Sequence, residues 1–397
     1  MLNICFEKDS FSSQKHTAKK TMNIITTDNH REQVECGQKI LKEHPDIYTD
    51  RVIQGIYKII QNYHLPAGIS ENDAFYISIY YYWRYGFVTK EVFAYDLLTK
   101  SQDLTASYIS HMDRLNYTRH LNKSEDEHFL SNKYETYCLL RDFYGREIIY
   151  VPDLSGMDDF CQFVSDHHEF VIKPVGLASS IGVRKCDLQS FHNDPGEALT
   201  AILQELESIR SHYKWSSGKG VLVEEIIKQD DSLARLHPAS VNNIRITTVK
   251  LGNDVHILYP VLRIGTGRRF ICSCSTGSIN TGINVKSGVT ETDGFDMETH
   301  HYIRHPDLGY SIQGIQIPKW DELVELVVML ALRFENLNYI GWDVTLSDQG
   351  KWVVIEANEN GAFDIMQLAY RKGIRDEFTD LIHWKPNQKY WWTGRYT

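Results

Sequence analysis

Residues 341–363, GWDVTLSDQGKWVVIEANENGAF, constrain the fold more than any other segment of the chain. Two runs rich in β-branched and aromatic residues lie on either side of SDQG at 347–350, whose residue types favour a tight turn. The segment therefore predicts a hairpin, with Leu346 opposite Lys351 if the turn spans those four residues. Because its two strands are rich in tryptophan, valine and isoleucine, the hairpin is expected to be mostly buried.

Three polar residues on this hairpin predict a metal site. Side chains alternate along a strand, so Glu356 and Asn358 share the face of the second strand that also carries Val354. The simple register puts Asp343 opposite Val354 and diagonal to Glu356, with about 7–8 Å between the backbones. Two carboxylates and one amide oxygen suit Mg²⁺, and a cation would offset the cost of burying the acids. The alternative is an exposed polar face on an antiparallel sheet.

The length and charge of the chain argue against several classes of protein. Its 397 residues suffice for two or three domains, and its formal net charge of −10 argues against general binding to nucleic acid or anionic membranes. No apolar run reaches the ~20 residues of a membrane span, and the N-terminus lacks the apolar core of a secretory signal. Seven scattered cysteines without a CxxC motif predict free thiols in a reducing cytoplasm.

Composition and periodicity divide the chain into three predicted regions: a mainly helical N-terminal region (1–122), an α+β domain (123–385) and a C-terminal tail (386–397). Helical spacing of apolar residues runs from 33 to 60, with a break at Pro45. Residues 71–88 are dense in tyrosine. Their rings either line a ligand groove or pack between helices with the hydroxyls at the rim, and packing is the favoured interpretation.

A strand that ends in a lysine and runs into a loop of small residues predicts a phosphate site. Lys173 lies at the end of the apolar strand FVIKP at 170–174, and GLASSIG follows at 176–182. Glycine and serine let backbone N–H groups approach phosphate oxygens, while lysine supplies a point charge. The loop does not match a Walker A sequence, so a structural turn is the alternative.

Acidic residues in the strand VLVEEII, residues 221–227, form a second candidate site. Glu224, Glu225 and the backbone at the strand end can recognise an adenine amino group. Asp231, a few residues later, can accept a hydrogen bond from a ribose hydroxyl. The alternative is a pair of solvated glutamates.

Two arginines lie within apolar strands and need an anionic partner. Arg245 belongs to NNIRITTV and Arg263 to LYPVLRIG, two strands that a Gly-Asn turn is predicted to join. Simple hairpin register pairs Arg245 with Pro260, which places Arg263 on the opposite face. A bulge at Pro260 would bring the two arginines together, and Arg245 is the stronger candidate.

The order of these features resembles the ATP-grasp superfamily over residues 125–375. A lysine on a helix, Lys133, precedes the strand lysine, the small-residue loop, the strand-end glutamates, the strand arginine and the acidic hairpin. Thirteen positions separate Asp343 from Glu356 and seven separate Glu224 from Asp231, which is similar to D-alanine–D-alanine ligases. HPASVNNIRITTV, HPDLGYSIQGIQIP and YIGWDV resemble the sugar-transfer-associated ATP-grasp family most.

The resemblance implies an ATP-grasp fold, in which two α+β subdomains clamp ATP and residues from about 150 to 228 form a mobile lid. It implies that Lys133 and Lys173 hold the α- and β-phosphates. The loop expected to close over the phosphates includes Gly176, Ser179, Ser180 and Gly182.

The resemblance also implies roles for the residues beyond the lid loop. Adenine would be recognised by Glu224 and by the backbone near Glu225 and Ile226, and ribose by Asp231. Two Mg²⁺ ions would be held by Asp343, Glu356 and Asn358, with Glu356 bridging them. The transferring phosphoryl group and an acyl phosphate would be stabilised by Arg245, with Arg263 as a second candidate.

Two features depart from the pattern. D-alanine–D-alanine ligases have an arginine two positions before the aspartate, where this chain has Gly341. The positive charge must then come from elsewhere, which increases the importance of Arg245. The N-terminal region is predicted to be helical where many relatives have an α/β domain, so substrates cannot be inferred by analogy.

The predicted function is an ATP-dependent carboxylate–amine ligase that acts through an acyl phosphate, in surface-polysaccharide or sugar-conjugate assembly. Expected substrates are a small-molecule or sugar-linked carboxylate and an amine, without nucleic acid; a homodimer is one option for the oligomeric state. Positioning and preorganised charge suffice for this chemistry, so no side-chain nucleophile is required. The alternatives are a kinase that phosphorylates a hydroxyl or carboxylate without an amine step, and a non-catalytic nucleotide-binding module.

Overall fold

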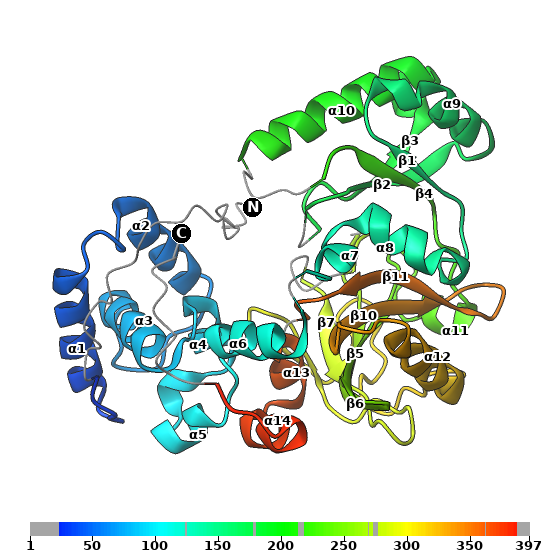
Figure 1. The fold of residues 1–397 in the computed structure, drawn as a ribbon. Helices are drawn as coiled ribbons and strands as arrows, with labels where there is room; N and C mark the ends of the chain where they lie inside the picture. The colour runs from blue at the N-terminus through cyan, green and yellow to red at the C-terminus, as the bar shows by residue number, and fades with distance from the viewer. Residues whose placement is uncertain are drawn as a thin grey trace. The chain divides into compact units, whose positions relative to one another are not determined.

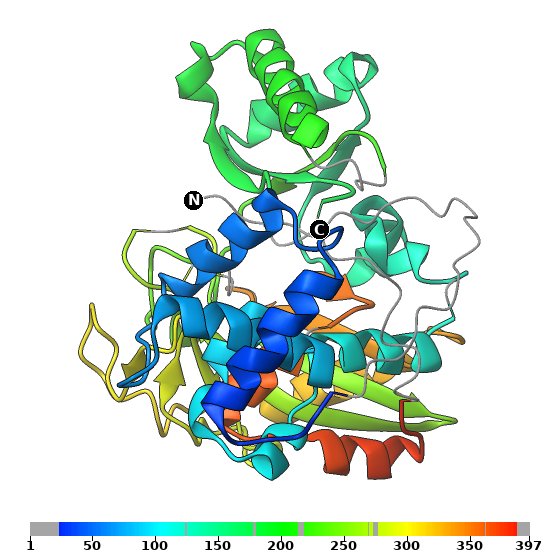
Figure 2. The ribbon, with the colours of Figure 1, turned by 90° about the vertical axis from the view of Figure 1, so that its left-hand side faces the viewer.

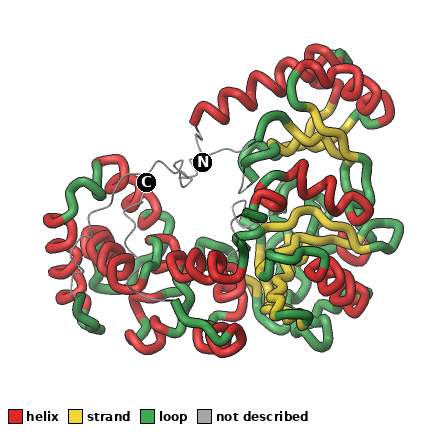
Figure 3. Tube along the Cα trace, in the orientation of Figure 1, coloured by secondary structure: helices red, strands yellow, loops and turns green. Residues whose placement is uncertain are grey.

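The computed structural model describes residues 24–123, 125–177, 180–212, 218–268, 270–272, 277–361 and 363–386. The chain forms two compact units. Unit 1 comprises the described residues of Met1–His120, Met297–His300 and Ala362–Thr397, and unit 2 those of Leu121–Asp296 and His301–Gly361. The described strands all belong to unit 2, whereas unit 1 consists of helices and loops (Figure 3). The predicted α+β class, preceded by a helical N-terminal region, is confirmed.

The helices of unit 1 are α1 (His30–Glu43), α2 (Asp50–Ile60), α3 (Glu71–Tyr85), α4 (Thr89–Ala94), α5 (Gln102–Ala106), α6 (His111–Leu121), α13 (Phe363–Tyr370) and α14 (Arg375–Ile382). The predicted break at Pro45 separates α1 from α2. The helices α1 and α3 pack against each other (Figure 2). Although α13 and α14 pack in unit 1, their assignment to the second functional domain stays a prediction.

The tyrosine-rich segment forms the core helix α3. A capping box between Ser70 and Asp73 begins it. Tyr80 and Tyr81 are fully buried, and their hydroxyls donate to the carbonyl oxygens of Ile25 and Leu97. These tyrosines therefore pack between elements, as the favoured interpretation expects. However, their hydroxyls are bonded inside the unit rather than lying at its rim.

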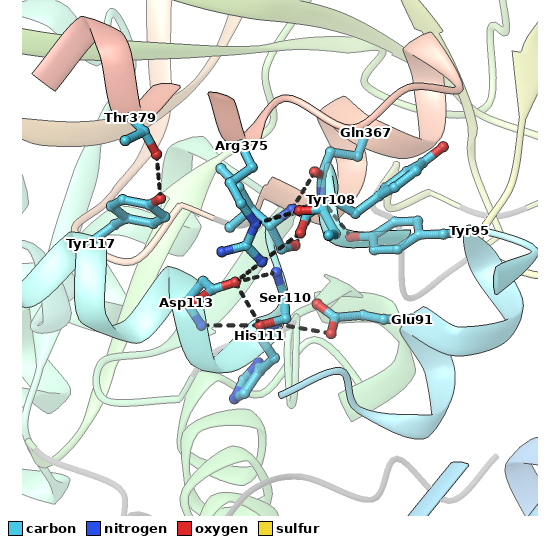
Figure 4. A network of polar contacts seen from close by, with 12 residues as sticks. Glu91, Tyr95, Tyr108, Ser110, His111, Asp113, Tyr117, Gln367, Arg375 and Thr379 are labelled. Carbon is cyan, nitrogen blue, oxygen red and sulfur yellow. Dashed lines mark hydrogen bonds and ion pairs between the residues drawn. The ribbon is translucent and has the colours of Figure 1, made fainter. Parts of the chain in front are cut away.

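A buried polar network holds α6 and α14 together (Figure 4). Arg375 is ion-paired with the fully buried Asp113 and donates to the carbonyl oxygen of Tyr108 at 2.8 Å. The Asp113 carboxylate also accepts a hydrogen bond from the hydroxyl of Ser110 at 3.0 Å. Because breaking a buried ion pair costs about 3–5 kcal/mol, this contact fixes the C-terminal helix in unit 1.

Unit 2 contains two antiparallel sheets (Figure 1). The four-stranded sheet, in the order β1-β4-β2-β3, consists of β1 (Ile148–Val151), β4 (Val221–Glu225), β2 (Glu169–Pro174) and β3 (Arg184–Asp187). The helices α9 (Met157–Asp166) and α10 (Pro195–His212) pack together on this sheet. Sequence patterns missed the short strand β3 because its residues, RKCD, show no apolar run.

The seven-stranded sheet has the order β11-β10-β5-β6-β7-β8-β9. Its strands are β5 (Asn243–Leu251), β6 (Asp254–Ile264), β7 (Ile279–Gly282), β8 (Gly294–Phe295), β9 (His301–Tyr302), β10 (Tyr339–Leu346) and β11 (Trp352–Asn358). The helix α12 (Trp320–Leu332) packs on β5, β6 and β11. Trp342, Val344 and Val354 are fully buried in the core of this unit, so the hairpin is buried as predicted.

Three shorter helices complete unit 2: α7 (His128–Ser131), α8 (Lys133–Leu140) and α11 (Asp231–Ala234). The single helix expected to carry Lys133 is divided in two. Asn132 has an extended backbone, and its side chain accepts hydrogen bonds from the backbone N–H groups of Tyr134 and Glu135 in the first turn of α8. Asparagine competes in this way with helix continuation. No helix in the described ranges has the length and apolar character needed to span a membrane.

Glu91 is a buried acid whose protonation should make the stability of unit 1 depend on pH. Its carboxylate accepts hydrogen bonds from the backbone N–H groups of Val88 and His111 (Figure 4). Burial, reinforced by the negative charge of Asp364, raises the pKa of Glu91 from an ordinary 4.5 to about 8.

We predict that Glu91→Gln removes a pH dependence of stability. Between the ordinary pKa and the raised one, the folded state keeps a proton that the unfolded state has lost, so stability falls as pH rises through this window. The unfolding temperature of the wild type relative to Glu91→Gln should therefore decline between about pH 5 and pH 8 and level off above it. A difference that does not change with pH would contradict the assignment.

Candidate functional site

The register of the β10–β11 hairpin differs from the predicted one. Leu346 pairs with Trp352 rather than Lys351, and the register shifts again between Asp343 and Val344, which marks a bulge in the ladder. Asp343 consequently lies directly opposite Glu356, instead of opposite Val354 and diagonal to Glu356. The predicted register was wrong because period-two alternation does not reveal a bulge, which inserts one extra residue into a strand. The bulge brings the two acids closer in register than the sequence indicates.

Charged residues lie in a row across three neighbouring strands. Arg245 on β5 pairs with Asp343 on β10, and Asp343 pairs in turn with Glu356 on β11. The Arg245 guanidinium donates two hydrogen bonds to the Asp343 carboxylate, from Nε at 2.7 Å and from Nη2 at 2.9 Å. This fork-to-carboxylate geometry is the strongest form of charge-assisted hydrogen bonding.

Arg263 joins the same carboxylate. Its Nη1 donates to Asp343 Oδ1 at 2.9 Å, and its side chain is only 5% exposed. The register between β5 and β6 shifts where Tyr259 and Pro260 lie, so Arg245 pairs with Val261 rather than Pro260. The bulge considered at Pro260 is thus present, and it brings both arginines to Asp343.

The two arginines decide the charge state of Asp343. Burial alone would raise the pKa of this carboxyl, but the positive charges of Arg245 and Arg263 outweigh burial and hold its pKa below the ordinary range. Asp343 is therefore an anion over the whole physiological pH range. An unpaired buried carboxylate would instead take up a proton.

Gly341 provides the space for Arg245. A Cβ atom on Gly341 would lie 2.6 Å from Arg245 Nη1 and 3.2 Å from the Cα of Gly361. No real Cβ atom tolerates such a contact, so a side chain here would displace the guanidinium. The Arg245 side chain, which extends from β5, thus occupies the space that a side chain at position 341 would need.

Glu356 and Asn358 extend from β11 beside this cluster. The Glu356 carboxylate is 35% exposed and lies 3.1 Å from Lys133 Nζ. The Asn358 side-chain nitrogen donates to the carbonyl oxygen of Gly341 at 3.4 Å. Lys133 also donates to the carbonyl oxygen of Leu177, so it links the hairpin to the small-residue loop.

Two residues of the small-residue loop have a positive backbone φ angle. Ser180 has φ +59° and Gly182 has φ +71°, and a Cβ on Gly182 would lie 2.8 Å from Cγ of Pro174. Gly176 is buried at the start of the loop. Ser179 lies outside the described residues, so its predicted phosphate contact stays a prediction.

Lys173 and Glu224 form a buried ion pair together with an arginine that the sequence analysis missed. Lys173 Nζ lies 2.8 Å from Glu224 Oε2, and Arg146 donates to the same oxygen from Nε at 2.9 Å and Nη2 at 2.7 Å. Burial would raise the pKa of Glu224, but the charges of Arg146 and Lys173 outweigh it and lower the pKa. Arg146 stands one residue before a predicted strand, where nothing in the local pattern distinguishes it from a solvated arginine.

The remaining nucleotide candidates lie outside this cluster of ion pairs. Glu225 ends β4, and its carboxylate accepts from the backbone N–H of Glu147 at 3.3 Å. Ile226 follows it and is half-buried. Asp231 is exposed at the first position of α11, and within the described ranges no ion pair joins it to another candidate. Its ribose role therefore stays a prediction.

The residues present fit ATP and a divalent cation. Carboxylate and amide oxygens of Glu356 and Asn358, with Asp343 across the hairpin, are the donors that Mg²⁺ prefers. Both oxygens of Asp343 already accept hydrogen bonds from arginine, whereas Lys133 is the one ion-pair partner of Glu356 among the described residues, and Glu356 is more accessible. Lys133, Lys173 and the arginines supply the positive charge that a triphosphate needs.

Comparison with protein families gives one match over most of the chain. The model of the sugar-transfer associated ATP-grasp family matches residues 113–382, a span that includes both sheets of unit 2 and every candidate residue named above. No curated protein sequence is significantly similar to the chain.

Solved structures of ATP-grasp ligases share weaker similarity with the chain. The ATP-grasp ligase PsnB with its minimal precursor has a TM-score of 0.36, 14% identity, and coverage of 64% of this chain and 62% of that one. D-alanyl-alanine synthetase A from Vibrio cholerae O1 biovar eltor str. N16961 has a TM-score of 0.36, 12% identity, and coverage of 64% and 60%.

D-Alanine-D-alanine ligase from Helicobacter pylori has a TM-score of 0.37, 14% identity, and coverage of 67% and 68%. The matched part of the chain thus spans less than two thirds of PsnB and of the Vibrio enzyme. At these TM-scores and identities, the likeness assigns no function to this chain.

We predict that Gly341→Ala displaces Arg245 and destabilises unit 2 by about 1–3 kcal/mol, the usual cost of overpacking. The reason is the 2.6 Å approach of the new Cβ to Arg245 Nη1. Urea denaturation of Gly341→Ala, Arg245→Ala and the double variant measures the coupling between the two positions. In the Arg245→Ala background the glycine substitution should cost less, because the crowded atom is gone. Equal costs in both backgrounds would show that Gly341 serves another purpose.

Proposed function

The chain belongs to the sugar-transfer associated ATP-grasp family, and we propose that it is an ATP-dependent carboxylate–amine ligase acting through an acyl phosphate. The observation that carries this proposal is the row of Arg245, Asp343 and Glu356 on adjacent strands. This row places oxygen donors for a metal next to a fixed positive charge near one edge of the sheet. Phosphoryl transfer requires both.

Lysines and arginines would hold the nucleotide and the developing charge. In the proposal, Lys133 and Lys173 bind phosphate oxygens, and Arg245 and Arg263 face the γ-phosphoryl group. Glu356, Asn358 and Asp343 would hold Mg²⁺, which would neutralise part of the charge on the phosphates. The bulge between β5 and β6 matters here, because it brings both guanidinium groups to one carboxylate.

The second half of the reaction needs orientation rather than a nucleophilic side chain. A substrate carboxylate takes the γ-phosphoryl group and ADP leaves; the amine then attacks the carbonyl carbon and releases phosphate. Fixed arginine donors can stabilise the oxyanion of that attack. The family description supports a sugar-linked acid or amine as one substrate, in surface-polysaccharide or sugar-conjugate assembly.

We predict that Glu356→Gln removes most of the Mg²⁺ dependence of ATP binding, because the amide keeps the shape of the side chain but loses its charge. Isothermal titration with ATP should show a large gain in affinity on adding Mg²⁺ for the wild type and a small one for the variant. Glu325→Gln is the matched control, since Glu325 is exposed on α12. The same Mg²⁺ effect in Glu356→Gln and wild type would remove Glu356 from the metal site.

We predict that ADP release depends on both a carboxylic acid and an amine. Panels of sugar acids, amino acids and amino sugars would be incubated with ATP and Mg²⁺, and ADP, phosphate and coupled products measured by mass spectrometry. A stable phosphorylated product that forms without an amine would favour a kinase instead. If no pair in a broad panel causes turnover while ATP still binds, the non-catalytic alternative gains support.

A further inference from the structure

The side chain of Arg146 is buried where it contacts both sheets of unit 2. Its side chain is 3% exposed, and its guanidinium carbon lies 4.9 Å from the centre of the Tyr144 ring. Nη1 donates to the carbonyl oxygens of Tyr144 at 2.9 Å and Val354 at 3.0 Å. Nε and Nη2 donate to Glu224. Every nitrogen of the guanidinium thus has a defined acceptor.

These contacts connect two candidate sites. Glu224 lies on β4 of the four-stranded sheet, whereas Val354 lies on β11, two residues before Glu356. A planar guanidinium holds its donors in fixed directions, so it can align the two strands more exactly than lysine could. Arg146 touches neither the predicted phosphate position nor the metal donors, and it can act on them only through Glu224, Lys173 and β11.

The charges around Glu224 do not balance. Two cations, Arg146 and Lys173, share one carboxylate oxygen, Glu224 Oε2. The group therefore carries one excess positive charge in a buried place, where such charge is strongly unfavourable without an anion. By contrast, Lys133 and Glu356 form a pair of equal and opposite charges. Without Arg146, Lys173 and Glu224 would also form a balanced pair.

We infer that Arg146 is a positioning residue that neutralises Glu224, so that the charge of Lys173 stays available to the phosphates of the nucleotide. This inference rests on the proposed ATP binding and deepens it. Arg146 thereby sets how strongly the site prefers a phosphorylated nucleotide over the bare nucleoside. The purine itself contributes no charge, so its recognition does not depend on this balance.

The test compares affinities for Mg²⁺–ATP and for adenosine, measured by displacement of a fluorescent nucleotide from the full chain. Arg146→Met removes the excess charge and should lower the ratio of ATP affinity to adenosine affinity by about tenfold or more, the size of one charge-assisted contact. Arg146→Lys keeps the charge and should keep the ratio near that of the wild type. Arg141→Met, at an exposed position on the same segment, is the control and should change nothing.

A second variant separates charge from structural damage. Arg146→Met/Glu224→Gln removes one positive and one negative charge together. The positive charge of Lys173 then has no carboxylate at position 224 to balance it, so the group again carries one excess positive charge. The ratio should recover to that of the wild type, even if the affinity for adenosine falls because Glu224 is changed. Thermal unfolding of each variant verifies that it is folded.

Three outcomes would decide the matter. Loss of ATP and adenosine affinity by the same factor in Arg146→Met, without recovery in the double variant, would make Arg146 a purely structural residue. An unchanged ratio in folded Arg146→Met would overturn the inference while leaving the proposed ATP site intact. Failure of the wild type to bind ATP at all would instead overturn the proposed function.

Discussion

The ion-paired cluster of Asp343 with Arg245 and Arg263 is the interaction on which the candidate site depends. A carboxylate at this depth must be paired or protonated, and two guanidinium groups keep it an anion. The site in turn requires two irregularities in the sheet: one bulge brings Arg263 to the side of Arg245 and Asp343, and another places Glu356 opposite Asp343. The cluster also requires a glycine at position 341, because any side chain there would occupy the position of the Arg245 guanidinium.

Acidic and basic side chains also alternate next to the four-stranded sheet. Glu224 lies between Lys173 and Arg146, and Lys133 bridges Glu356 and the backbone of the small-residue loop. Each candidate phosphate-binding lysine is therefore ion-paired with an acid. These ion pairs fix the positions of the positive charges, and preorganised charge lowers the reorganisation needed for transfer of a phosphoryl group.

Much of this arrangement could be predicted from the sequence. Periodicity located most helices and strands, and the types and spacing of Lys173, Glu224, Asp343, Glu356 and Asn358 indicated nucleotide and metal chemistry. The register could not be predicted, because a bulge changes pairing without a distinct residue pattern. The role of Arg146 could not be predicted either, because it depends on contacts with strands that are distant in the sequence.

We propose that the β10–β11 hairpin and the lysines facing it form one ATP and Mg²⁺ site. A crystal structure with Mg²⁺ and a non-hydrolysable ATP analogue tests this most directly. We expect the metal on the oxygens of Glu356 and Asn358, the phosphates against Lys133 and Lys173, and the γ-phosphate facing Arg245. A triphosphate bound elsewhere, or a bound nucleotide whose metal lies away from β11, would contradict it.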